Sequence, residues 1–142
     1  MTPRCVLVLD PAAPRWLIAN ASAVLGASVG ARGDVELGPG LVDATGSHWP
    51  AIAEIVVPVL AAPAAELVEL RAAAHAAGVT ALAFPDLARA AATYAELAAA
   101  MAATPAAEVH IHGLALLGPD RLVRGLTRGL RALGDPVTEA VR

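Results

Sequence analysis

Continuous apolar runs and helix-spaced apolar positions alternate along this chain. The first apolar run ends at Asp10 and contains no polar residue, which predicts a fully buried strand over residues 4–9. The same pattern predicts three further strands, over residues 52–60, 79–84 and 109–117. The last of these begins with alternating polar residues, so its start is expected to be half exposed and its end buried.

Apolar residues at spacings of three and four predict helices between these strands. A first helix is expected over residues 14–32, with Leu17, Ala21 and Leu25 on its buried face. Three more are predicted, over residues 63–77, from Asp86 to a stop at Thr104, and over residues 119–133. A hairpin with its tip at residues 44–47 precedes the second strand. The sequence therefore predicts one domain, residues 1–142, with a three-layer α/β/α sandwich and a mixed, mostly parallel sheet of about four strands.

Composition and missing motifs exclude several classes of protein. The apolar run before Asp10 is too short for a signal peptide or a membrane span, so we expect a cytoplasmic protein without membrane contact. Hydrophobic residues make up 57% of the chain and charged residues 16%, which favours a homodimer that covers apolar surface. All ten basic residues are arginines, so Schiff-base chemistry on lysine is excluded. Walker, Rossmann, nucleophile-elbow and HExxH motifs are absent, and no cofactor is expected.

Two polar residues are candidates for a site. Asp10 follows the first strand, where open α/β sheets form ligand crevices, and its carboxylate either acts there or caps the loop that Pro11 begins. Asn20 lies three residues after Leu17 and is predicted to lie on the buried face of the first helix. Its amide either holds a substrate carbonyl near Asp10 or holds the loop backbone. The crevice requires Asn20 to be buried.

The histidines raise the question of a metal. His110 and His112 share one strand face, a spacing that can chelate an ion, and His48 is a conceivable third ligand. An exposed polar face at the start of a strand explains the pair without metal, so we expect no metal site. His75 lies in the last turn of the predicted second helix, where the helix dipole favours a positive charge, and is expected to be structural.

Arginines dominate the last predicted helix. Their spacings of three and four put them on one helix face, and with Asp120 they give the helix a net charge of +3 in a chain of net charge −3. That face either is simply solvated or binds tRNA or another phosphate-bearing ligand. The residues are Arg121, Arg124, Arg128 and Arg131.

Several segments resemble the bacterial domain-of-unknown-function family DUF2000, and the likeness covers nearly the whole chain. The segments are residues 5–10, 19–25, 43–48 and 114–130. That family is in turn similar to the type II peptidyl-tRNA hydrolases, small dimeric α/β/α domains that cleave the ester between a peptide and its tRNA. The strand-loop-helix opening and the turn at Leu117-Gly118-Pro119 look like the two ends of those enzymes. The resemblance implies their fold and gives Asp86 the place of a functional aspartate; capping of a helix is the other role for this residue.

The chain departs from those hydrolases at the start of the first helix. They carry a Gly-Lys pair and Ala-Ala-Gln with a later histidine, whereas residues 15–20 read Arg-Trp-Leu-Ile-Ala-Asn and Ala23 takes the place of the histidine. Because the lysine is missing, their catalysis does not follow from the resemblance.

Two functions stay open. One is an ester hydrolase or acyl transferase that acts on an aminoacyl or peptidyl ester, with Asp10, Asn20 and Asp86 as its site and the arginine face opening onto the same crevice. The other is a non-catalytic homodimer that binds a small ligand or a partner in an apolar pocket lined by Trp16 and Trp49.

Overall fold

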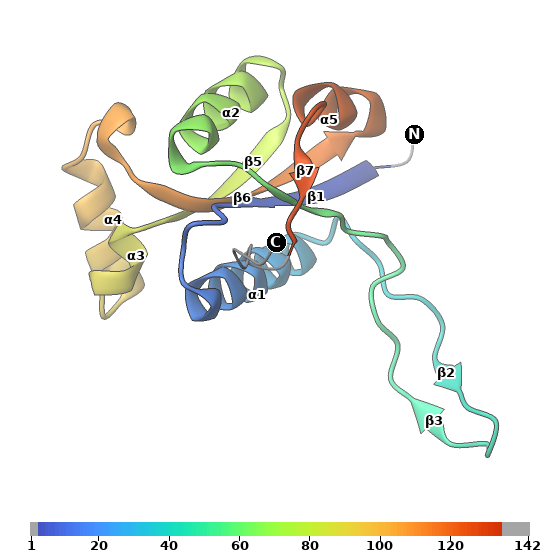
Figure 1. Cartoon of the computed structure of the whole chain (residues 1–142). Coiled ribbons are helices and arrows are strands. Elements are labelled where there is room, and N and C mark those ends of the chain that lie inside the picture. Colours follow the sequence, from blue (N-terminus) through green and yellow to red (C-terminus); the bar gives the residue numbers. More distant parts are fainter. Residues whose placement is uncertain (1–2, 135–142) are drawn as a thin grey trace, which may run out of the picture.

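A five-stranded sheet forms the middle of the computed structural model, which describes residues 3–134 (Figure 1). The strand order is β5–β6–β1–β4–β7, and the strands are β1 (Pro3–Leu9), β4 (Val59–Ala61), β5 (Thr80–Pro85), β6 (Ile111–Pro119) and β7 (Arg131–Ala132). Within this sheet β1 and β4 pair in parallel, and the other three neighbouring pairs are antiparallel. The sheet is mixed as expected, but antiparallel neighbours predominate. The reason is that the chain leaves β5 and enters β6 at the same edge of the sheet, where Pro85 pairs with Ile111.

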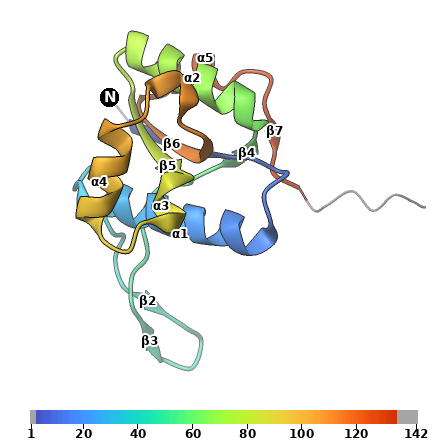
Figure 2. The same cartoon turned by 90° about the vertical axis from the view of Figure 1, so that its left-hand side faces the viewer.

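Helices cover both faces of the sheet, which confirms the three-layer α/β/α architecture (Figure 2). The helix α1 (Arg15–Ala31) lies on one face, and α2 (Ala64–Ala76) and α5 (Asp120–Leu126) lie on the other. Side chains of β1 alternate between the two cores, with Val6 and Val8 toward α2, and Leu7 and Leu9 toward α1. The first strand is therefore buried from both sides, as its continuous apolar run predicts.

A two-stranded ribbon projects from the sheet (Figure 1). It ends in the predicted hairpin, formed by β2 (Leu41–Val42) and β3 (His48–Trp49). The backbone pairing continues toward the sheet, because Gly38 N donates to Ile52 O and Glu54 N donates to Glu36 O. The strand predicted over residues 52–60 is therefore wrong for its first part, which pairs within the ribbon, and β4 begins only at Val59.

The Asp43 carboxylate organises the tip of this hairpin. It accepts hydrogen bonds from Thr45 and from the backbone N–H of Ser47, and its other oxygen accepts from the Trp49 indole at 2.9 Å. These bonds, led by the Thr45 side chain and followed by Trp49 and Ser47, hold the pKa of Asp43 well below its usual range. The tip is thus ordered by its own side chains.

The third predicted helix is two short helices, α3 (Leu87–Ala90) and α4 (Tyr94–Ala102), followed by the 3-10 turn η1 (Ala106–Glu108). Ala91 is extended and ends α3. Thr93 then caps α4 by accepting from Glu96 N at 3.1 Å, while the Glu96 carboxylate accepts from Ala92 N. This reciprocal cap, an S/T-x-x-E motif, starts a new helix at Tyr94.

Among residues 3–134 no helix is both long and apolar enough to span a membrane. Cys5 is a buried free cysteine, and burial raises the pKa of its thiol. It therefore packs as a small apolar residue, as its position in the apolar run predicts.

Candidate functional site

Three chain segments bring two aspartates and two histidines to one edge of the sheet. Asp10 follows β1, Asp86 follows β5, His110 immediately precedes β6, and His112 lies in β6, the strand between β1 and β5. Backbone bonds hold the segments together: Asp10 N donates to His112 O at 3.0 Å, and Asp86 N donates to His110 O at 2.8 Å. We call these four residues the Asp–His cluster.

An irregularity in the β5–β6 pairing lies beside His112. Phe84 pairs with Gly113 and Pro85 pairs with Ile111, so His112 is an extra residue of β6 without a β5 partner. Bulges of this kind redirect a side chain and are common beside active sites. Here the imidazole of His112 is buried but its tip reaches the loop that follows β5, where Asp86 lies.

Asp86 and His112 form the shortest side-chain contact of the cluster. Nε2 of His112 lies 2.7 Å from Oδ1 of Asp86, and the His112 side chain is 9% exposed. Nη1 of Arg89 donates to the same oxygen at 3.1 Å. The hydrogen bond from His112, assisted by Arg89, lowers the pKa of the Asp86 carboxyl. An ionised carboxylate accepts hydrogen bonds only, so Nε2 of His112 carries a proton.

The other ring nitrogen of His112, Nδ1, is buried and makes no hydrogen bond within the described residues. One nitrogen of each histidine and one oxygen of Asp10 lie within 4.8 Å of one another, and the two rings meet edge to face. With Nε2 protonated, a neutral His112 offers a free lone pair at Nδ1.

The Asp10 side chain hydrogen-bonds to the loop that follows it. Its Oδ1 accepts from Ala12 N at 2.9 Å, which confirms the loop-capping role. The residue is 8% exposed and makes no ion pair with any residue from 3 to 134. Asp86 occupies the predicted N-cap position of α3, but its side chain makes no capping hydrogen bond, and its carboxylate binds His112 instead.

Comparison with known proteins gives the family. A family model described as "Protein of unknown function (DUF2000)" matches residues 3–133. The chain belongs to the DUF2000 family. Its structure is similar to that of the protein of unknown function Atu0240 from Agrobacterium tumefaciens strain C58, with a TM-score of 0.82, 16% sequence identity, and coverage of 93% of this chain and 98% of that one. No curated protein matches the chain. The peptidyl-tRNA hydrolase resemblance stays a prediction.

In this DUF2000 chain Asn20 is exposed, so its predicted burial is wrong and a crevice that depends on it is not formed. The buried residues of α1, namely Leu17, Ala21, Leu25 and Val29, are spaced by four, and a residue three after Leu17 falls beside that stripe. Asn20 lines an open hollow of about 600 Å³ with Trp16, Phe84, Ala88 and Arg89. The guanidinium of Arg89 lies 5.3 Å over the Trp16 ring.

The pocket predicted between Trp16 and Trp49 is not formed, because Trp49 lies on the projecting hairpin and hydrogen-bonds to Asp43. His48 lies on the same hairpin, and the residue that joins the two β6 histidines is Asp10. The exposed face expected for His110 and His112 is found only for His110. The exposed-face explanation of the pair therefore fails for His112.

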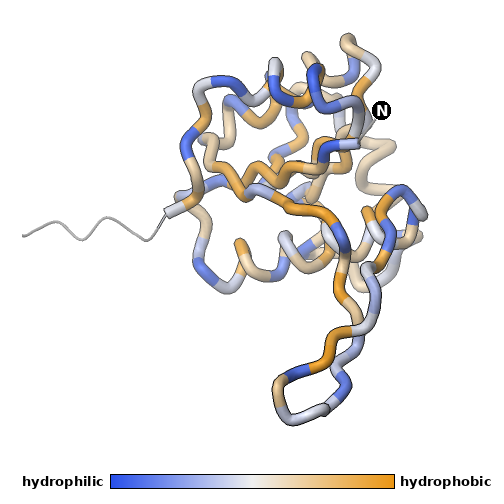
Figure 3. The backbone as a smooth tube through the Cα atoms, turned by 90° about the vertical axis from the view of Figure 1, so that its right-hand side faces the viewer, coloured by the Kyte–Doolittle hydropathy of each residue, from blue (hydrophilic) through white to orange (hydrophobic). Residues whose placement is uncertain are grey.

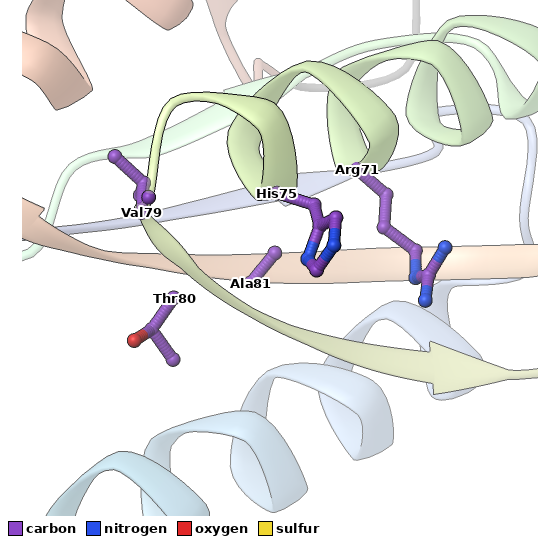
Figure 4. Close-up of a pocket in the computed structure, with 6 residues that line it drawn as sticks. Arg71, His75, Val79, Thr80 and Ala81 are labelled. Carbon is purple, nitrogen blue, oxygen red and sulfur yellow. The ribbon is translucent and has the colours of Figure 1, made fainter.

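A separate hollow of about 370 Å³ lies between α2 and β5 (Figure 4). Arg71 and His75 reach into it from α2, over Val79, Thr80 and Ala81. His75 is in the last turn of α2, the position predicted for a structural histidine.

The four arginines do not share one helix face, because α5 ends at Leu126. Gly129, three residues beyond the end of α5, has a positive φ of 87°, and Arg131 lies on β7. Arg121 and Arg124 lie on the helix that follows the far end of β6, so they do not open onto the edge that carries Asp10. Arg131 pairs with Ala61, and Ala61 is the β4 partner of Leu9 at the end of β1, so Arg131 lies at the same sheet edge as the Asp–His cluster.

Sequence reasoning selected Asp10 and Asp86 but missed His112 as their partner. The signal available was the spacing of His110 and His112 at the start of a strand. The sequence does not give the strand order. Both aspartates lie beside these histidines only because β6 lies between β1 and β5.

Proposed function

We propose that this protein hydrolyses acyl esters with a water molecule held in the Asp–His cluster. The observation that carries the proposal is the buried Nδ1 of His112, which has no partner within the described residues while Nε2 is bonded to Asp86. A histidine oriented by a carboxylate, with its second nitrogen free, is the usual arrangement of a general base. The convergence of titratable groups favours hydrolysis over purely passive ligand binding.

The chemistry is a single addition and elimination at the ester carbonyl. The water oxygen attacks the carbonyl carbon while its proton passes to Nδ1 of His112, and Asp86 stabilises the imidazolium. The tetrahedral intermediate then breaks its bond to the alcohol oxygen, which takes the proton from Nδ1. A carboxylic acid and an alcohol are released and His112 is neutral again. Aminoacyl or peptidyl esters are the substrate class that the resemblance to peptidyl-tRNA hydrolases suggests.

The test measures ester hydrolysis with matched histidine variants. N-acetylphenylalanine methyl ester and p-nitrophenyl acetate serve as substrates, with His112→Gln as the variant and His75→Gln as the control on α2. We expect His112→Gln to lower kcat/KM about 10²–10⁴-fold, because a positioned base contributes that much. Equal rates in the two variants, or no hydrolysis above buffer by the wild type, would refute the proposal and leave the ligand-binding alternative.

A phosphate-bearing ester such as peptidyl-tRNA would meet Arg131 at this edge. Arg131 is exposed and lies on β7, at the edge where β1 and β4 end, whereas Arg121 is beyond the opposite end of β6. With a peptidyl-tRNA substrate, Arg131→Ala should raise KM and Arg121→Ala should leave it unchanged. The same loss in both variants would indicate nonspecific attraction to the RNA backbone.

We also propose a homodimer, because apolar side chains on and next to the projecting ribbon are exposed. Ile52 is 71% exposed, Val56 is 83% exposed and Trp49 is 59% exposed, and Figure 3 shows apolar stretches along this segment. Isolated two-stranded hairpins are marginal in water, and contiguous exposed apolar surface commonly marks an interface. Light scattering should give a dimer for the wild type and a monomer for Trp49→Ser combined with Ile52→Ser; a monomeric wild type would refute the dimer.

A further inference from the structure

The geometry points to a binding site for a divalent transition-metal ion, formed by Asp10, His110 and His112. Each residue contributes one ligand atom, and these three atoms lie within 4.8 Å of one another at the sheet edge. The strand order explains the placement: His112 in β6 and His110 just before it supply two imidazoles, and Asp10 after β1 supplies a carboxylate beside them. The inference departs from the sequence-based expectation of no metal, whose reason does not hold for the buried His112.

Nδ1 of His112 is the first observation that favours an ion. It is buried, and it has no hydrogen-bond partner anywhere in residues 3–134. A buried polar atom without a partner destabilises the fold, so we expect a water molecule or an ion to bind there. A water molecule can donate a hydrogen bond to the lone pair of Nδ1, and a metal ion can coordinate it.

Asp86 supplies the second observation. Its carboxylate binds Nε2 of His112 at 2.7 Å, on the side of the ring away from the free nitrogen. Metal-binding histidines almost always donate their other N–H to a carboxylate, a carbonyl or water, which orients the ring and increases its basicity. The pair therefore matches the carboxylate–histidine–metal arrangement, with Asp86 as the positioning residue.

The charge on Asp10 supplies the third observation. Asp10 is 8% exposed and has no ion pair within the described residues, although buried carboxylates are normally paired or bound to metals. Arg89, the nearby cation, is bonded to Asp86. A divalent cation would balance the negative charge of Asp10, which has no ion pair within the described residues.

Ligand type decides the class of ion. Imidazole suits zinc, copper, iron and nickel, whereas magnesium and calcium prefer oxygen ligands. Two histidines and one carboxylate are the ligand set of catalytic zinc sites and of non-haem iron(II) sites, both of which keep an open position. Zinc bonds of about 2.0–2.1 Å require ligand atoms about 3.3–3.4 Å apart, so the widest separation in the cluster must contract by up to about 1.5 Å. His110 is exposed and can change its rotamer to close that gap.

Metal binding does not rest on the proposed ester hydrolysis, because it is measured without substrate. The lone pair at Nδ1 holds either a proton from water or an ion. Asp10, His110 and His112 would hold the ion, and a bound divalent ion would supply activation of a water molecule in place of the base at Nδ1.

The experiment titrates untagged, chelator-treated protein with Zn²⁺ and with Mg²⁺ by calorimetry, and with Co²⁺ by visible absorption. We expect one Zn²⁺ to bind per chain and the bound Co²⁺ to show an absorption spectrum typical of a low coordination number. Mg²⁺ should not compete with Zn²⁺ for the site. His110→Gln is the decisive variant, since this exposed side chain makes no hydrogen bond within the described residues and the fold should not depend on it. It should weaken Zn²⁺ binding by at least about tenfold, and Asp86→Asn should weaken it by about 10–100-fold.

His48→Gln on the hairpin and His75→Gln on α2 are the matched controls and should bind Zn²⁺ like the wild type. Asp10→Asn keeps an oxygen for Ala12 N and so separates loss of a ligand from loss of the loop. Binding that survives His110→Gln, or a wild type that binds no Zn²⁺ at millimolar concentration, would overturn the inference. Hydrolysis without Zn²⁺ binding would refute the metal site alone, and Zn²⁺ binding without hydrolysis would refute the hydrolase alone.

Discussion

Gly113→Ala tests whether the close approach of β6 and β1 requires a glycine beside the Asp–His cluster. A Cβ atom on Gly113 would lie 2.6 Å from Cδ1 of Leu9 and 3.4 Å from Cδ1 of Leu25. Both leucines are buried between the sheet and α1, at 0% and 2% exposure, so Leu9 cannot swing into solvent. Overpacking of this kind costs about 1–3 kcal/mol. Restricting the unfolded chain returns roughly 0.4–1 kcal/mol, so we expect a net loss of about 1–2 kcal/mol.

Urea unfolding followed by tryptophan emission measures this loss. The midpoint should fall while the m-value stays constant, because the surface exposed on unfolding does not change. Gly118→Ala is the matched control in the same strand, since its Cβ would meet Val79 at an ordinary 3.6 Å. The control should stay within about 0.5 kcal/mol of the wild type. A Gly113→Ala protein as stable as Gly118→Ala would refute the packing argument.

Three further predictions concern stability. Leu67 on α2 is fully buried, so Leu67→Ala should lower the free energy of unfolding by about 2–5 kcal/mol in the same urea assay. Gly78 ends α2 with φ of 73°, and Gly78→Ala should cost about 1–2 kcal/mol; no change would contradict a left-handed backbone there. The pKa of Asp43 is lowered by the hairpin-tip hydrogen bonds, so its contribution is complete above the ordinary aspartate pKa of about 3.9 and is lost only as pH falls through the lower folded value. In Trp16→Phe protein, Trp49 emission should therefore stay constant down to about pH 3, and a transition centred near pH 4 would contradict the tip network.

The elements that were predicted correctly are those whose signal is local. The first strand and α1 follow from a continuous apolar run and from residues spaced by four, and Gly78 and the tip at residues 44–47 follow from turn chemistry. The failures occurred where pairing decides the structure. Residues 52–57 have the composition of a buried strand, yet residues 52–54 pair with residues 36–38 in the projecting ribbon.

The candidate site shows the same division. The sequence by itself determined which groups are available: two aspartates after apolar strands, two histidines with one residue between them, and no lysine. Tertiary structure alone decided which of them meet. It placed β6 antiparallel between β1 and β5, made His112 the extra residue in the β5–β6 pairing, and left Asn20 on the solvent side of α1. The physical reason is that strand order and register depend on contacts between residues far apart in the chain, which local periodicity does not encode.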